Sequence, residues 1–217
     1  MTPPRMTIVL IAVGALAACA SGPKVPDWSL SALGHVQRFA EAYLSGDARV
    51  APREFEQARA DTARTGRPDL VARIELNRCA VQVASLDFAP CTGFDALAGD
   101  ASAAERAYAR YLAGQAGPAD APQLPPQHRA VAAGGTDGAA IGEPLARPIP
   151  AAALPRQGRA TPAVVGQAVD TASSQGWRRP LLAWLGVQRQ RAEQGGDAAE
   201  AARIGRRMDL VQPAARP

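Results

Sequence analysis

Apolar residues recur at intervals of three and four along much of the chain, the spacing that places them on one face of an α-helix. One segment, 68–86, is apolar on more than one side, so we expect it to be a central helix. Another begins with Ser102-Ala-Ala-Glu105, the signature of a capping box. The pattern therefore predicts an N-terminal helical domain at residues 28–113, with helices at about 28–44, 50–65, 68–86 and 102–113.

Glycine and proline interrupt this pattern between residues 114 and 160. They account for 15 of these 47 residues, a density that excludes long helices. We expect a linker here, with at most short turns near 127–132 and 143–147. Helical spacing resumes at Thr161-Pro162, an N-cap followed by a proline that suits the first helical turn. The remainder predicts C-terminal helical hairpins at residues 161–212.

Composition supports an all-α fold. The chain holds 49 alanines in 217 residues, and aromatic residues make up only 5%. This much alanine favours helix over sheet and argues against a β-sandwich, a β-barrel or a doubly wound parallel sheet. We therefore expect antiparallel helical hairpins, packed as a bundle and interrupted by the long Pro/Gly/Ala-rich linker.

Two predicted turns carry a further pattern. Segment 46–58 has the sequence Gly-Asp-x3-Ala-x3-Phe-x2-Ala, and segment 196–208 repeats it more loosely. The pattern resembles the second half of a tetratricopeptide (TPR) unit, in which glycine turns the chain and the small residue lets the helices approach. No 34-residue period connects the two segments, so the resemblance is to TPR-like packing rather than to a TPR array. It implies a binding scaffold rather than a catalyst.

Residues 1–18 have the features of an export signal. A short basic segment precedes an apolar run that is too short to span the roughly 30 Å of a bilayer core. The run ends in Leu16-Ala17-Ala18-Cys19, which resembles the lipobox of bacterial lipoproteins. The resemblance implies cleavage before Cys19, a diacylglyceryl thioether on its sulfur, and acylation of the new amine. The alternative is an ordinary signal peptide in which Cys19 is incidental.

The lipid anchor determines the expected location. Position 20 is alanine, and in the sorting rule that this segment resembles, the lack of aspartate there favours the outer membrane. Residues 19–27 then form a short tether between the bilayer, reached through acylated Cys19, and a body on the periplasmic side. Without Arg5 the mature chain has 23 basic and 20 acidic residues, a net charge of +3. This small excess does not predict nucleic acid as a partner.

Two cysteines remain for the folded part of the chain. Cys79 lies in a predicted helix and Cys91 in the segment after it, and the chain between them can fold back to the roughly 6 Å between Cα atoms that a bridge needs. Because disulfides persist in exported proteins, we expect a Cys79–Cys91 disulfide that contributes roughly 3 kcal/mol. Free buried thiols, or a redox or metal role, are the alternatives.

The sequence offers few residues for catalysis. It has no Gly-x-Ser-x-Gly elbow, and neither His35 nor His128 has a metal-type partner at helical spacing. We expect no catalytic residue, no metal and no cofactor, and no functional role for either histidine.

One segment has the residue types of a binding site. Trp177, Arg178, Arg179 and Trp184 combine the two residue types that are over-represented at binding hot spots. We take them as candidates for partner binding. The alternative is that both tryptophans pack inside the C-terminal bundle.

These features predict a membrane-anchored periplasmic lipoprotein that acts as a non-catalytic helical scaffold and binds another protein of the cell envelope. The alternative is a cell-wall-acting enzyme, or a peptidoglycan-binding protein, that uses acidic residues with no recognisable spacing.

Overall fold

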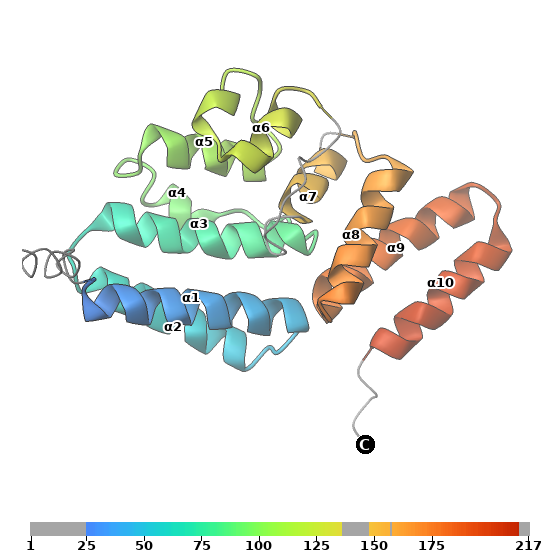
Figure 1. Ribbon diagram of the computed structural model, residues 1–217, viewed down its shortest axis with the longest axis horizontal. Coiled ribbons are helices and arrows are strands. Elements are labelled where there is room, and N and C mark those ends of the chain that lie inside the picture. The colour runs from blue at the N-terminus through green and yellow to red at the C-terminus, as the bar shows by residue number, and fades with distance from the viewer. Residues whose placement is uncertain (1–24, 136–147, 157, 213–217) are drawn as a thin grey trace, which may run out of the picture.

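The computed structural model describes residues 25–135, 148–156 and 158–212. Within these residues all regular secondary structure is helical, which confirms the predicted all-α class. None of the described helices is long and apolar enough to cross a membrane. The elements are α1 (Asp27–Ser45), α2 (Val50–Ala63), α3 (Pro68–Ala84), α4 (Thr92–Asp95), α5 (Ala103–Leu112), the 3-10 helix η1 (Ala121–Gln123), α6 (Pro126–Ala132), α7 (Pro148–Arg156), α8 (Pro162–Ser174), α9 (Arg178–Gln194) and α10 (Ala198–Val211) (Figure 1).

The Gly46-Asp47 turn joins α1 and α2 into an antiparallel hairpin, as predicted (Figure 1). Gly46 has a φ of 79°, a left-handed conformation that favours glycine. The carboxylate of Asp47 accepts two backbone N–H groups at the start of α2. Phe39 on α1 and Phe55 on α2 then pack with their ring centres 5.5 Å apart. The aromatic residue of segment 46–58 therefore fills the groove between the two helices.

The apolar face of α1 is covered only in part. Leu33 lies within about 20° of Ala40 and Leu44 around the helix axis, at 100° per residue. Ala40 and Leu44 are buried, but Leu33 is 55% exposed and Leu30 is 56% exposed. The helical spacing of Leu33 with Ala40 and Leu44 predicts that it belongs to the buried face. This prediction is wrong, because the described body covers this face only toward the C-terminal end of α1.

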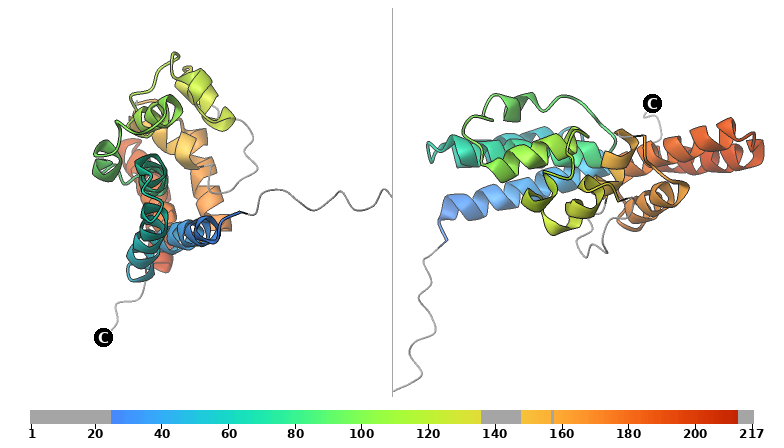
Figure 2. Two further views of the ribbon diagram at one scale, coloured as in Figure 1. Left: turned by 90° about the vertical axis from the view of Figure 1, so that its left-hand side faces the viewer. Right: turned by 90° about the horizontal axis from the view of Figure 1, so that it is seen from above.

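Helix α3 runs through the middle of the N-terminal part, as predicted. It lies between the α1–α2 hairpin on one side and α4 and α5 on the other (Figures 1 and 2). Ten of its seventeen residues are buried, and they point to more than one side of the helix. This explains why its sequence shows no single apolar face.

The structure corrects the prediction of a linker over residues 114–160. The described parts of this stretch contain η1, α6 and α7, and Leu124, Val131 and Leu154 are almost fully buried in the main core. Pro126 and Pro148 each occupy the first position of a helix, where the missing N–H costs no hydrogen bond. Pro155 lies inside α7, but only one residue before its end. The turn predicted near 143–147 lies outside the described residues.

The main core continues from the N-terminal part into the C-terminal part. Helix α7 packs against both α3 and α8, and one cluster of buried residues includes members of α3, α5, α6, α7, α8, α9 and α10. Residues 28–113 and 161–212 therefore share one core in the described structure, rather than forming two helical domains joined by a linker.

The C-terminal helices α8, α9 and α10 lie within residues 161–212, the range in which the sequence predicts helical hairpins. Thr161 caps α8 and Asp197 caps α10, each by accepting a backbone N–H in the first turn. A turn with Gly196 at a φ of 75° reverses the chain between α9 and α10. Helix α10 packs mainly on α9, so this hairpin projects from the body (Figures 1 and 2).

Candidate functional site

The predicted cysteine pair comes together in the structure. The Cα atoms of Cys79 on α3 and Cys91 before α4 lie 5.9 Å apart, and the two residues form a disulfide. Cys79 is buried and Cys91 is half-buried. The bridge holds the segment 86–91 against α3. Cys19, the predicted lipid site, and the signal segment lie outside the described residues.

Trp184 cannot contact a partner in this structure, which corrects its candidate role. Its side chain is fully buried, and its indole Nε1 donates a hydrogen bond to the carbonyl oxygen of Ala84 at 3.3 Å. This bond connects α9 to the end of α3. Trp177, the residue before α9, is half-buried and packs against both core clusters. The two tryptophans thus join the C-terminal helices to the rest of the body.

Arg178 and Arg179 serve the same junction. Arg178 donates to the carbonyl oxygen of Gly46 at 3.2 Å, and Arg179 donates to that of Tyr43 at 2.9 Å. The guanidinium of Arg179 also lies 4.2 Å from the centre of the Tyr43 ring. Burial, followed by a hydrogen bond to Asp87, raises the pKa of Tyr43 to about 12. Both arginines therefore hold the end of α1 through its backbone carbonyls.

A cavity that the sequence did not predict opens beside the disulfide. Its volume is about 480 Å³, within the range of ligand pockets. The floor is apolar and comes from α3, α4 and α5, with Val83, Phe94 and Leu112 among its side chains. The segment 88–91, which the disulfide holds in place, forms one wall.

Three arginines line this cavity. Arg106 and Arg110 are one helical turn apart on α5, and Arg156 comes from the end of α7. Asp95 is the one acidic side chain among the lining residues. The cavity therefore carries a positive charge above an apolar floor.

The arginines differ in how far they are neutralised. Arg110 forms an ion pair with Asp120, which lies outside the lining. Arg106 donates to the backbone carbonyl of Ala101, and Arg156 donates to that of Ala113 at 2.9 Å. Neither has a carboxylate within ion-pair distance among the described residues. Both can therefore accept a negative charge from a ligand without breaking an ion pair.

No sequence motif marked this cavity. Its lining comes from five separate stretches of the chain, between Cys79 and Arg156. The arginines of α5 are spaced like those of an ordinary solvated helix face, and Arg156 lies in the stretch that was predicted to be a linker. Only the packing of α7 against α3 and α5 brings these residues together.

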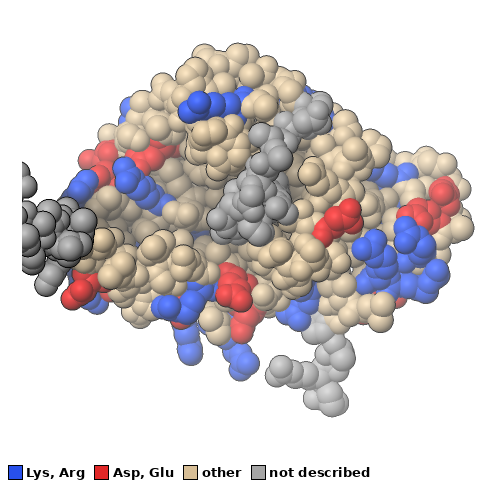
Figure 3. All heavy atoms as spheres, viewed as in Figure 1, with Lys and Arg blue, Asp and Glu red and all other residues tan. Residues whose placement is uncertain are grey.

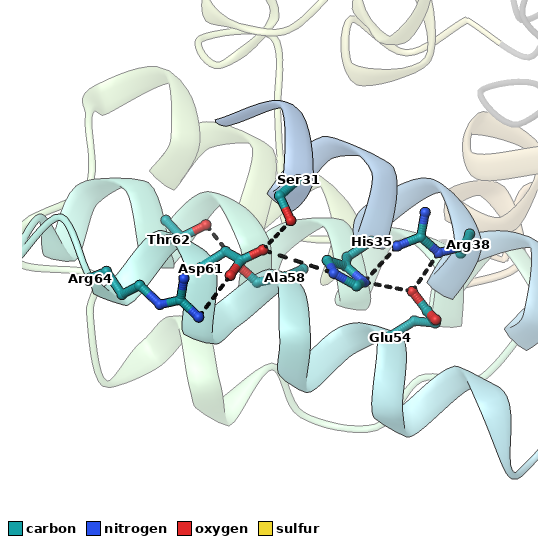
Figure 4. Close-up of polar contacts among 8 residues, drawn as sticks. All are labelled: Ser31, His35, Arg38, Glu54, Ala58, Asp61, Thr62 and Arg64. Carbon is teal, nitrogen blue, oxygen red and sulfur yellow. Dashed lines mark hydrogen bonds and ion pairs between the residues drawn. The ribbon is translucent and has the colours of Figure 1, made fainter. Parts of the chain in front are cut away.

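A second polar cluster lies between α1 and α2 (Figure 4). Ser31 donates to the buried carboxylate of Asp61 at 2.6 Å, and His35 Nδ1 lies 2.7 Å from Glu54. The hydrogen bond from His35, with a further contribution from Arg38, holds the pKa of Glu54 below its usual value. Because the Ser31 hydroxyl is directed to Asp61 rather than to the imidazole, the cluster is not a catalytic triad. It fixes α1 against α2.

His128, predicted to have no role, is buried in the core. Its ring lies 5.4 Å from that of Tyr108 and 4.9 Å from that of Tyr111, measured between centres. Its Nδ1 and the Tyr111 hydroxyl have no hydrogen-bond partner among the described residues. Burial lowers the pKa of His128 to about 4 and raises the pKa of both tyrosines. The imidazole is therefore neutral at ordinary pH.

The C-terminal hairpin carries mixed charge. Basic side chains gather over α9 and α10 with acidic ones beside them (Figure 3). Arg203 binds Glu200 through two hydrogen bonds of 2.6 Å, and Arg189 pairs with Glu193. Ion pairs compensate only part of this surface, because Arg206 and Arg207 have none among the described residues. No group of three or more potential metal ligands occurs among the described residues.

Comparisons with known protein families, curated proteins and solved structures find no match for this chain. The cavity and the sequence features are therefore the basis for a function.

Proposed function

We propose that this chain is a lipid-anchored, non-catalytic binding protein of the cell envelope, held on the periplasmic face of the outer membrane through Cys19. Its cavity beside the disulfide receives an anionic, partly apolar segment of another envelope protein. The observation that carries the proposal is the combination of an apolar floor with Arg106 and Arg156, which have no carboxylate partner of their own.

The chemistry of the cavity supports an anionic ligand. Guanidinium groups present several N–H donors in a fixed plane and bind carboxylates in a bidentate way. An apolar side chain beside such a carboxylate would displace water from Phe88 and Pro90, which line the cavity and are not fully buried, and this burial adds affinity without requiring another charged contact. The arginines fix the orientation of the segment, and the apolar lining residues supply contact area.

The anchor and the disulfide support the same compartment. The resemblance of Leu16–Cys19 to a lipobox supports export of the mature chain from the cytoplasm, to a compartment where disulfides persist. The disulfide holds one wall of the cavity in place, so the shape of the cavity depends on a compartment in which the disulfide stays oxidised.

The acidic residues give less support to a cell-wall enzyme. A glycosidase-type mechanism needs two carboxylates that are free to act as acid and base. In the described residues the buried carboxylates already have partners: Asp61 is bound by Ser31 and Arg64, and Glu75 is bound by Arg59 and Arg78.

Site-specific photocross-linking in cells tests the proposal. Gln115 is exposed and lines the cavity, so a photoreactive phenylalanine at this position should capture one envelope protein. Arg106→Gln with Arg156→Gln should abolish this product. The matched pair Arg49→Gln with Arg53→Gln removes the same charge from the other side of α3 and should leave it unchanged.

Two results would count against the proposal. One is a product that persists in the Arg106/Arg156 variant while circular dichroism shows an intact fold. The other is the same set of products from Gln115 and from Gln57, an exposed position on α2 far from the cavity, because this would indicate random collisions.

A further inference from the structure

Exposed apolar side chains gather at the start of the described chain. Five large apolar residues are strongly exposed among the described residues, and three of them, Val25, Leu30 and Leu33, lie within nine positions of one another. Leu30 and Leu33 are neighbours on one side of α1. The other two are isolated, Val50 at the start of α2 and Leu210 near the end of α10.

This patch continues a face that the protein uses for packing. Leu33 has the same direction around the axis as Ala40 and Leu44, which α3 and α9 help to cover near the other end of α1. Toward the N-terminus no helix among the described residues covers the same face. Leu30 and Leu33 thus belong to an apolar face of α1 that is buried at its C-terminal end and exposed at its N-terminal end.

The length of chain between the patch and the lipid site limits what can cover it. Val25 is six residues after Cys19, and six extended residues span at most about 21 Å. An acyl group on Cys19 therefore confines the start of α1 to the neighbourhood of the bilayer surface. A tether this short gives the patch a high effective concentration at the lipid interface.

We infer that the first two turns of α1, with Val25, Leu30 and Leu33, rest in the headgroup–acyl boundary of the bilayer and form a second membrane contact. The inference rests on the proposed anchoring through Cys19. Trp28 lies within the same turns, and tryptophan is enriched at this boundary because its ring is apolar and its N–H is polar.

The contact is apolar rather than electrostatic. The acidic residue of the first turn of α1 is Asp27, and the nearest arginine along the helix, Arg38, is bound to Glu54 at 2.7 Å. No uncompensated basic side chain of α1 therefore faces the headgroups. Lys24, directly before Val25, is one basic residue beside the contact. A single charge is weaker than a basic patch, so we expect the contact to depend only slightly on salt and on the proportion of anionic lipid.

This contact would also orient the body. The α1–α2 hairpin lies on one side of α3, and the cavity residues of α5 and α7 lie on the other (Figure 1). With the start of α1 on the bilayer, the cavity opening lies on the side of α3 away from the hairpin that carries the membrane contact. A partner protein could then reach the cavity while the lipid anchor remains inserted.

Fluorescence quenching by brominated lipid tests the inference on the full lipidated protein. The protein is placed in vesicles of phosphatidylethanolamine and phosphatidylglycerol with or without brominated chains. Bromine quenches tryptophan only at short range, so we expect loss of the Trp28 signal, which the variant Trp28→Phe identifies. Leu30→Gln with Leu33→Gln should remove most of the quenching, whereas Val50→Gln, an exposed valine at the opposite end of the hairpin, should not.

Each outcome decides between the two proposals. Flotation of the vesicles with quenched Trp28 supports the inference if the quenching changes little between about 0.1 M and 1 M salt, since the Debye length falls from about 10 Å to 3 Å over this range. Flotation with Trp28 unquenched overturns it and leaves the lipid anchor in place. A dimer that Leu30→Gln disrupts, seen with unquenched Trp28, assigns the patch to a second copy. Failure to float overturns both the anchor and this contact.

Discussion

Acid should destabilise this protein through His128. Its imidazole lies between Tyr108 and Tyr111, is only 2% exposed, and has no hydrogen-bond partner for Nδ1 among the described residues. Protonation would place a charge in this apolar environment with no carboxylate to receive it. Burial therefore lowers the pKa from 6.5 to about 4 in the folded protein.

The size of the effect follows from the difference between the folded and unfolded pKa values. Between them the unfolded chain binds the proton and the folded chain does not, so the free energy of unfolding falls as the pH falls. The contribution of neutral His128 to stability is fully present above pH 6.5, the pKa in the unfolded chain. It is lost progressively as the pH falls toward about 4, the pKa in the folded protein. Between about pH 7.5 and pH 5 the loss from this one group is about 2 kcal/mol.

Chemical denaturation measured at these two pH values, followed by circular dichroism, tests the reasoning. His128→Phe keeps an aromatic ring in the cluster and removes the titrating group, so the pH-dependent loss should shrink by about 2 kcal/mol relative to the unmodified protein. The comparison uses the change with pH within each protein, so a constant packing cost of the larger ring cancels. Equal pH dependence in the two proteins would refute the account of His128.

Two further changes test the packing around the cavity. Cys79→Ser with Cys91→Ser removes the disulfide, which joins residues twelve positions apart, and should lower the free energy of unfolding by about 3 kcal/mol. In the native protein, alkylation followed by intact-mass analysis should find no free thiol at either position. Gly93→Ala would place a methyl group against the buried carboxylate of Glu75 and should lower the free energy of unfolding by about 1–3 kcal/mol, measured by thermal unfolding. The control Gly99→Ala meets open space and should be nearly neutral. Equal effects of the two changes would contradict the packing described.

Local signals in the sequence were sufficient for the hairpins. The Gly46-Asp47 turn and the caps at Ser102 and Thr161 act within a few residues, so their structure follows from the residues themselves. The disulfide could be predicted for the same reason, because its loop is short. The exposure of Leu33 could not, since it depends on where distant helices end.

Proline content misled the prediction for residues 114–160. Proline disrupts the interior of a helix, but Pro126 and Pro148 begin helices and Pro155 lies one residue before the end of α7. Composition also could not distinguish a tryptophan that packs from one that binds. The side chain of Trp184 is buried because α3 and α9 meet there, and that contact joins residues 100 positions apart.

The lipid on Cys19 is the central claim, because the compartment, the membrane contact and the access to the cavity all follow from it. Intact-mass analysis of the protein extracted from membranes tests it most directly. The account predicts a chain that begins at Cys19 and carries the added mass of acyl groups, together with loss of Cys19→Ser from the membrane fraction. A mature chain that retains residues before Cys19, or that begins at Cys19 without acyl groups, would contradict it. So would a Cys19→Ser variant that stays in the membrane fraction.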